Sequence, residues 1–133
     1  DADYEIAKEA YLEYFRKMHQ LFPKCKKMLM AVRNQIASSH HTLSGLLYDA
    51  VEDQLYTTRI YDIEPIVDPM GVGDAFIAAY IHAQQKWGDK NQYCLDFSLS
   101  ASAIKNTVPG DQNLVTEEEI INNMTSSGGR IQR

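Results

Sequence analysis

The sequence is short of the features that mark several classes of protein. It has two cysteines, Cys25 and Cys94, in neither a CxxC pair nor a disulfide-dense framework, which weighs against a disulfide-stapled secreted domain. We recognise in it neither the pattern of a signal peptide nor an apolar run long enough to span a bilayer. Its 13 lysines and arginines are outnumbered by 18 acidic residues, and the net charge of -5 argues against a nucleic-acid or membrane-surface partner. We therefore predict a cytoplasmic protein.

The composition that remains is that of a globular domain. Hydrophobic residues make up 44% of the 133 positions and charged residues 23%, which is enough for a real core. We predict one domain over residues 1–127, followed by a flexible tail over residues 128–133. The sequence begins with aspartate rather than methionine, and its helical pattern starts almost at once. We therefore expect it to be part of a longer chain.

The first half of the sequence predicts a helix and then strands. In residues 3–22 the apolar positions recur every four residues, which is the pattern of an amphipathic helix. Residues 26–32 (KKMLMAV) are typical of a buried strand, and the polar residues 33–41 are predicted to be a loop. Residues 42–50 and 54–67 are rich in β-branched and aromatic side chains, so they predict two or three strands.

The second half predicts helices. One is expected over about residues 74–87, ended by Gly88, and another over about residues 92–106. A third begins with a capping box made by Thr116 and Glu119. This order of elements favours an α/β fold in which helices cover a sheet.

One glycine-rich segment carries a chemical signal at the predicted start of the first of these helices. Residues 68–76 (DPMGVGDAF) place Gly71 and Gly73 just before Asp74. Glycines let backbone amides approach a bound group, and the unpaired amides of a first helical turn favour an anion. Asp74 could then act as a base toward a hydroxyl beside a bound phosphoryl group. The alternative from spacing alone is that Asp74 is an ordinary helix cap.

Two other segments each allow two interpretations. His40 and His41 follow two serines, but the sequence supplies no further converging ligands, so a polar loop is favoured over a metal or nucleophile site. The small residues 98–103 (SLSASA) either let helices pack closely or leave room for an adenine ring.

Residues 68–76 resemble the DTxGAGDxF signature of the ribokinase-like (pfkB) carbohydrate kinases. Residues 33–49 (RNQIASSHHTLSGLLYD) are similar to a stretch of the 2-keto-3-deoxygluconate kinase branch, and residues 100–120 resemble the last helix, nucleotide loop and closing helix of the family. The resemblance covers nearly the whole sequence in the family's order.

The resemblance implies roles for the glycine-rich segment. Asp74 would be the catalytic base, and the amides of Gly71, Val72 and Gly73 would form the anion hole for the γ-phosphate of ATP, which is used with Mg²⁺. Asp68 and the carbonyl of Met70 would help to bind a monovalent cation such as K⁺. The threonines usual in the signature are replaced here by Pro69 and Met70, which leaves main-chain carbonyls as cation ligands.

The resemblance also implies a nucleotide site. Many members have a threonine-leucine-glycine turn where this sequence has Arg33 and Asn34, so these two residues are the candidates to take its place at the phosphates; the alternative is that this branch does without the contact. The remaining residues expected around the nucleotide are Ser100, Ala103, Asn106 and Gly110.

Family members are considerably longer than this sequence. The resemblance implies that it is the C-terminal part of a ribokinase-like α/β/α sandwich without its lid domain. The missing N-terminal half would supply the lid, most sugar contacts and the homodimer interface of the full-length enzyme, so the fragment alone is expected to be inactive. The alternative is a non-catalytic α/β nucleotide-binding or assembly module in which Asp74 only caps a helix.

Overall fold

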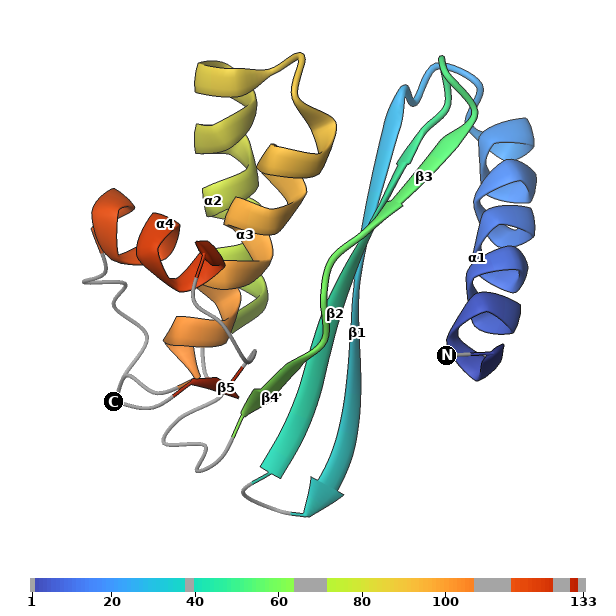
Figure 1. Cartoon of the computed structure of the whole chain (residues 1–133). Helices are drawn as coiled ribbons and strands as arrows, with labels where there is room; N and C mark the ends of the chain where they lie inside the picture. The colour runs from blue at the N-terminus through green and yellow to red at the C-terminus, as the bar shows by residue number, and fades with distance from the viewer. Residues whose placement is uncertain (1, 38–39, 64–71, 107–115, 126–129, 132–133) are drawn as a thin grey trace.

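The computed structural model describes residues 2–37, 40–63, 72–106, 116–125 and 130–131. Within these residues the chain forms helices on both sides of one sheet (Figure 1). In chain order the elements are α1 (Ala2–Leu21), β1 (Lys27–Ala37), β2 (His40–Asp49), β3 (Gln54–Thr57), β4 (Tyr61–Ile63), α2 (Val72–Trp87), α3 (Asn91–Lys105), α4 (Glu117–Thr125) and β5 (Arg130–Ile131).

The order and type of these elements confirm the predicted α/β fold, with one clear error. Residues 33–41, predicted to be a loop, lie mostly in strands, because β1 continues to Ala37 and β2 begins at His40. Backbone pairing between the two strands extends the sheet here in spite of the polar side chains, since Arg33 and Asn34 are exposed and need no apolar surroundings. Within the predicted tail, Arg130–Ile131 form β5 beside β4.

β2 is the central strand of the described sheet. It pairs with β1 on one edge and with both β3 and β4 on the other, all antiparallel, while β5 joins β4 in parallel. The short gap between β3 and β4 is closed by Thr58. Its amide donates to the Gly45 carbonyl at 3.0 Å, and its hydroxyl accepts from the Gly45 amide at 2.9 Å. The two short strands therefore follow β2 as one interrupted edge.

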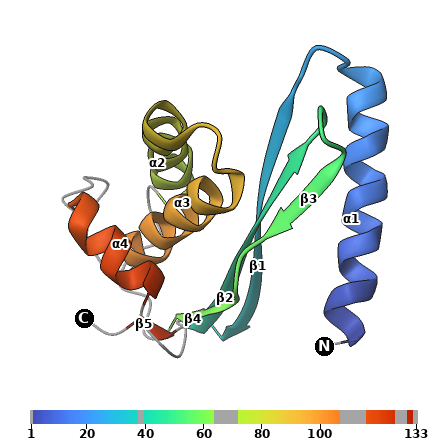
Figure 2. The ribbon, with the colours of Figure 1, turned by 45° about the horizontal axis from the view of Figure 1, so that its top comes forward.

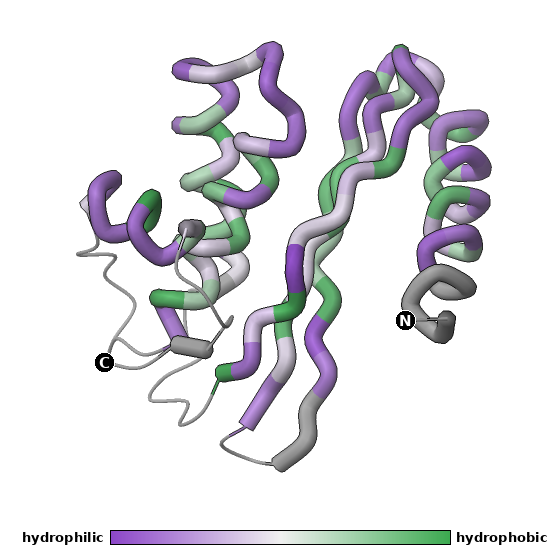
Figure 3. Tube along the Cα trace, in the orientation of Figure 1, coloured by the Kyte–Doolittle hydropathy of each residue, from purple (hydrophilic) through white to green (hydrophobic). Residues whose placement is uncertain are grey.

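Side chains of β2 alternate between two hydrophobic layers. Its odd-numbered residues face α2 and α3, and its even-numbered residues face α1, so the chain forms three layers (Figures 1 and 2). The middle stretches of β1 and β2 are accordingly coloured largely hydrophobic in Figure 3. The buried residues of the first layer are Leu43, Leu47, Tyr61, Ile63, Phe76, Leu95, Leu99 and Ala103. Those of the second are Phe15, Leu46 and Tyr48.

Apolar packing, a ring pair and a charged cluster connect α1 to the sheet. The Phe15 ring stacks on Tyr48 with 5.7 Å between centroids and an interplanar angle of 6°. Arg16 makes a bidentate contact with Asp53, through Nε at 3.0 Å and Nη2 at 2.8 Å, and the Tyr48 hydroxyl donates to the same carboxylate at 2.6 Å. The hydrogen bonds from Arg16 and then Tyr48 lower the pKa of Asp53 to about 2.

The turn between β2 and β3 depends on the same aspartate. Asp53 has φ of 53°, in the left-handed region that aspartate and asparagine tolerate better than most residues. Asp49, at the end of β2, accepts hydrogen bonds from the amides of Val51 and Glu52 and so organises the start of the turn. The geometry of this turn therefore aims Asp53 at Arg16 of α1.

α2 and α3 form a helical hairpin. α2 ends just before Gly88, as predicted, and a Cβ added there would lie 2.6 Å from the Gln84 carbonyl oxygen. The buried Cys94 thiol donates to the carbonyls of Ala83 at 3.4 Å and Trp87 at 3.2 Å, and burial raises the pKa of this thiol. α3 is therefore locked to the last turns of α2.

α4 is capped and docked as its sequence predicts. The Thr116 hydroxyl accepts from the Glu119 amide at 3.1 Å, which confirms the capping interaction. Ile120 then packs on the α2–α3 hairpin with Ala83 and Phe97. None of the described helices is both long and apolar enough to cross a membrane.

Candidate active site

The start of α2 places Gly73 and Asp74 at the end of the α2–α3 pair that is remote from Gly88. α2 begins at Val72, so Gly73 and Asp74 lie in its first turn, and both are exposed. Phe76 of α2 and Ala103 of α3 share one hydrophobic cluster, which places the first turn of α2 beside the last turn of α3 (Figure 1). The unpaired amides of this turn make it electropositive. The other predicted residues of the segment, Asp68, Met70 and Gly71, lie outside the described residues, as does Gly110.

Packing against the described residues does not require a glycine at position 73. Among those residues, a Cβ added at Gly73 would meet no heavy atom within 4 Å, and the φ of Gly73 lies outside the left-handed region that favours glycine. Neither conformation nor contact therefore explains the glycine here. Close approach of a bound group to the backbone would explain it.

Arg33 and Asn34, predicted together at the phosphates, point to opposite faces of the sheet. Arg33 pairs with Leu43, which faces α2 and α3, whereas Asn34 pairs with Thr42, which faces the α1 side. Directly paired residues share a face of a sheet. Only Arg33 therefore lies on the face that carries the start of α2.

The two histidines of β2 also separate. His40 Nε2 contacts the Asp62 carboxylate, whereas His41 is buried, with only 6% of its surface exposed. The Nδ1 atom of His41 is buried, and none of the described residues forms a hydrogen bond with it. Burial, then the nearby charges of Arg33 and His40, lower the pKa of His41. Sequence reasoning missed this position, although the alternation of His41 with Leu43 and Leu47 along the strand could have revealed it.

Residues of α3 predicted at the nucleotide are all buried. The Ser100 hydroxyl donates to the Ile120 carbonyl and accepts from Asn123, both at 2.8 Å, so it joins α3 to α4. Ala103 is fully buried in the core. This placement favours the packing interpretation of residues 98–103, and a nucleotide role for Ser100 and Ala103 stays a prediction.

Asn106 ends α3 beside the start of α2. Its Nδ2 donates to the Ser102 carbonyl at 3.1 Å, while its buried Oδ1 has no hydrogen-bond partner among the residues that the structure describes. A buried amide oxygen of this kind is uncommon in folded proteins, where such groups are normally paired. The Oδ1 atom of Asn106 is therefore an acceptor, at the end of α3 near the start of α2, that a ligand could use.

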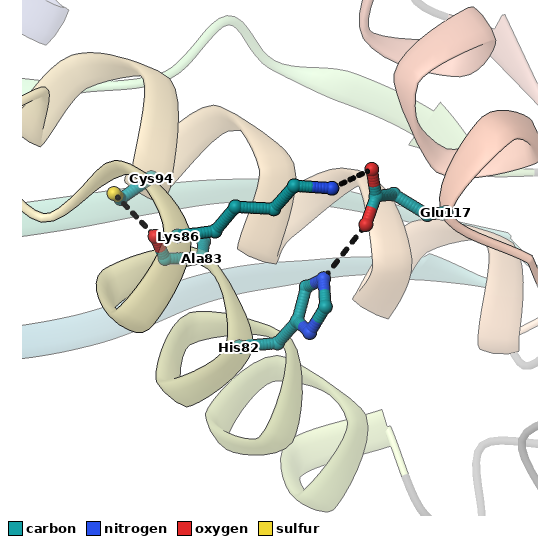
Figure 4. A network of polar contacts seen from close by, with 5 residues as sticks. All are labelled: His82, Ala83, Lys86, Cys94 and Glu117. Atoms are coloured by element: carbon teal, nitrogen blue, oxygen red, sulfur yellow. Dashed lines mark hydrogen bonds and ion pairs between the residues drawn. The ribbon is translucent and has the colours of Figure 1, made fainter.

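A network of polar side chains connects α4 to α2 (Figure 4). Glu117, in the first turn of α4, contacts His82 Nε2 at 2.8 Å and accepts from Lys86 Nζ at 2.7 Å. The bond from Lys86, then that from His82, lowers the pKa of the Glu117 carboxyl. His82 also lies against the Phe97 ring, with 5.8 Å between ring centroids. The acidic start of α4 thus has specific partners on α2, which the sequence did not indicate.

The comparisons with known proteins fit this architecture. No protein-family model matches the sequence, and no curated protein matches it either. The structure, however, matches the 2-dehydro-3-deoxygluconokinase of Thermotoga maritima with a TM-score of 0.82 and 27% sequence identity, over 90% of this chain. The chain has the fold of a PfkB carbohydrate kinase. A PfkB family carbohydrate kinase of Listeria grayi matches it with a TM-score of 0.79 and 30% identity, over 85% of this chain.

The PfkB likeness covers only part of each of these kinases. The chain spans 35% of the Thermotoga protein and 34% of the Listeria protein. A third solved structure, from Enterococcus faecalis, is 17% identical with a TM-score of 0.71, which extends the likeness in fold alone. The predicted resemblance to the ribokinase-like (pfkB) kinases is thus confirmed, over a segment about a third as long as these proteins.

Proposed function

We propose that this chain belongs to an ATP-dependent kinase that phosphorylates a hydroxyl of a sugar or sugar acid, with 2-keto-3-deoxygluconate as its substrate. The observation that carries the proposal is the exposed Asp74 in the first turn of α2, within a fold shared with a 2-dehydro-3-deoxygluconokinase. The chain supplies the base, the anion hole and part of the ATP site. The rest of the protein supplies most sugar contacts.

Asp74 has a position suited to general-base chemistry. It follows Gly73 at the electropositive start of α2, where its carboxylate can accept a proton from a substrate hydroxyl while the amides of residues 71–73 stabilise charge on the transferring phosphoryl group. The open space around Gly73 leaves room for that group. The oxygen of the hydroxyl then attacks the γ-phosphorus as the bond to ADP breaks.

Mg²⁺ and a monovalent cation place different demands on the chain. Among the described residues, no group of three or more His, Cys, Asp or Glu side chains could hold a metal ion. Mg²⁺ in phosphoryl-transfer sites is held largely by substrate phosphates and water. A nucleotide-bound Mg²⁺ would therefore not need such a group of protein ligands. Asp68 and Met70 remain our candidates for a monovalent cation such as K⁺.

The proposed enzyme needs the remainder of its polypeptide. Because the chain spans about a third of the solved kinases it matches, we expect the missing N-terminal portion to complete the sugar site and to form the homodimer. We also expect this chain alone to be inactive. The two free thiols are consistent with a cytoplasmic enzyme.

Replacing Asp74 in the full-length protein tests the proposal. We expect Asp74→Asn to lower the rate of ATP-dependent phosphorylation of 2-keto-3-deoxygluconate by about a hundredfold or more, because general-base catalysis contributes a factor of that order. Nucleotide affinity, measured by calorimetry, should change little. Asp89→Asn is a matched control, since Asp89 is an exposed aspartate beyond the other end of α2. Equal rates for the Asp74 and Asp89 variants would remove Asp74 from the chemistry.

A further inference from the structure

We propose that His41 binds the phosphate chain of the nucleotide by donating a hydrogen bond from Nδ1 to an anionic oxygen. This inference rests on the proposed function and adds a residue to its ATP site. His41 lies in β2, and no residue in the described part of the chain forms a hydrogen bond with its Nδ1 atom.

The burial of Nδ1 is the first observation. His41 is 6% exposed, and a polar atom buried without a hydrogen bond destabilises the fold relative to a paired one. The strand fixes the backbone of His41 between Gln35 and Ile63, so the ring cannot leave this face without breaking the ladder. A bound ligand would supply the missing partner.

The face on which His41 lies is the second observation. Its cross-strand partner Ile63 belongs to the hydrophobic cluster that contains Phe76, two residues beyond Asp74. Paired residues share a face, so His41 lies on the face of the sheet that the first turns of α2 cover. The Nδ1 atom of His41 and the proposed anion hole therefore lie on the same side of the sheet, near the start of α2.

The charges at this end select an anionic ligand group. Arg33 shares the face through its pairing with Leu43, and the amide end of α2 adds a partial positive charge. α3 contributes Lys105 in its last turn, whereas Asp74 contributes the carboxylate assigned to the sugar hydroxyl. His40 and Asp62 contact one another on the opposite face.

The protonation state of His41 fits a donor to phosphate. Its lowered pKa leaves a neutral imidazole at neutral pH, with one ring nitrogen that donates and one that accepts. A phosphate oxygen only accepts, so it selects the tautomer with the proton on Nδ1. The bound anion also favours the charged ring, so nucleotide affinity should rise as pH falls toward the pKa of His41.

Three variants of the full-length protein separate this hydrogen bond from packing. His41→Leu removes the donor, whereas His41→Asn places an amide nitrogen near the position of Nδ1. His40→Asn is the neighbouring control on the opposite face. We expect His41→Leu to raise the KM for ATP about tenfold or more, the effect of losing a hydrogen bond to a charged group, with a smaller change in kcat. His41→Asn should stay near wild type and lose the rise in affinity at low pH, and His40→Asn should change neither constant.

Binding measurements keep the test independent of turnover. By calorimetry, His41→Leu should weaken ATP binding but leave adenosine binding unchanged. The inference is overturned if His41→Leu binds ATP as wild type does, or if His41→Asn is impaired as much as His41→Leu. If wild type binds ATP in this pattern but phosphorylates no sugar acid, the proposed function fails and the His41 inference stands. If wild type does not bind ATP, both fail.

Discussion

Strands β1 and β2 are neighbours of similar apolar character, yet they have different surroundings. In β2, seven consecutive residues from Leu43 to Asp49 are buried, because strands flank both of its edges and helices cover both of its faces. In β1, the apolar residues 28–32 are all partly or largely exposed, and among the described residues only β2 pairs with this strand.

The difference shows that β1 is more apolar than its present surroundings require. A continuous apolar run is typical of a strand that lies inside a sheet and is covered on both faces. Since the chain spans about a third of the kinases it matches, a strand from the rest of a longer protein beside β1 would explain the pattern. The difference in burial between β1 and β2 can be tested by substituting residues that are directly paired between the two strands.

The largest expected effect comes from the pair Leu47 and Leu29. These two leucines are directly opposite in the sheet, but Leu47 is fully buried and Leu29 is only partly so. Leu47→Ala should lower the free energy of unfolding by about 2–5 kcal/mol, and Leu29→Ala by clearly less, as measured by urea unfolding of this chain. In the full-length protein the two losses should converge. Equal losses already in this chain would mean that β1 is not an edge strand in solution.

A smaller effect is expected from the pair Gly45 and Ala31. A Cβ added at Gly45 would lie 3.3 Å from a methyl carbon of Leu95 and 3.3 Å from one of Leu99, whereas Ala31, opposite it in β1, is exposed. Gly45→Val should therefore destabilise the chain by about 1–3 kcal/mol through overpacking. Ala31→Val should change stability by at most about 0.5 kcal/mol. A stable Gly45→Val variant, judged by thermal unfolding, would show that α3 can move away from β2.

The smallest effect concerns the α1 side of β2 and depends on pH. The pKa of Asp53 is about 2 in the folded chain against 3.8 for an ordinary aspartate, so its stabilising contribution is present above pH 3.8 and disappears as pH falls toward 2. The difference in unfolding free energy between wild type and Asp53→Asn should therefore narrow over that window. Asparagine tolerates the positive φ, which limits the change to charge. A difference that stays constant with pH would show that the ion pair with Arg16 does not form in solution.

Most of the fold could be predicted because its signals are local. The amphipathic pattern of α1, the glycine that follows α2 and the capping threonine of α4 each act within a few residues, and each prediction was confirmed. The strand character of residues 33–37 and of His40 and His41 could not be predicted in this way. Their extended form depends on pairing between β1 and β2, which no local pattern records.

In the candidate site, too, residues with a local sequence signal could be predicted, whereas those whose placement depends on strand pairing could not. The glycine-rich segment pointed to Asp74, and the structure places this residue at an exposed helix start. The separation of Arg33 from Asn34, and the burial of His41, depend on which residues pair across the strands. A shift of one residue in that pairing would exchange the two faces, so sequence alone left both questions open.

The hydrogen bonds of Cys94 give the chain a built-in kinetic probe. Its thiol is buried between α3 and the last turns of α2, with a raised pKa, whereas Cys25 is only partly buried. Thiol reagents attack the exposed thiolate, so alkylation of Cys94 must wait until the two helices separate. The labelling rate at Cys94, with Cys25 as an internal reference, therefore reports how often this helical hairpin opens.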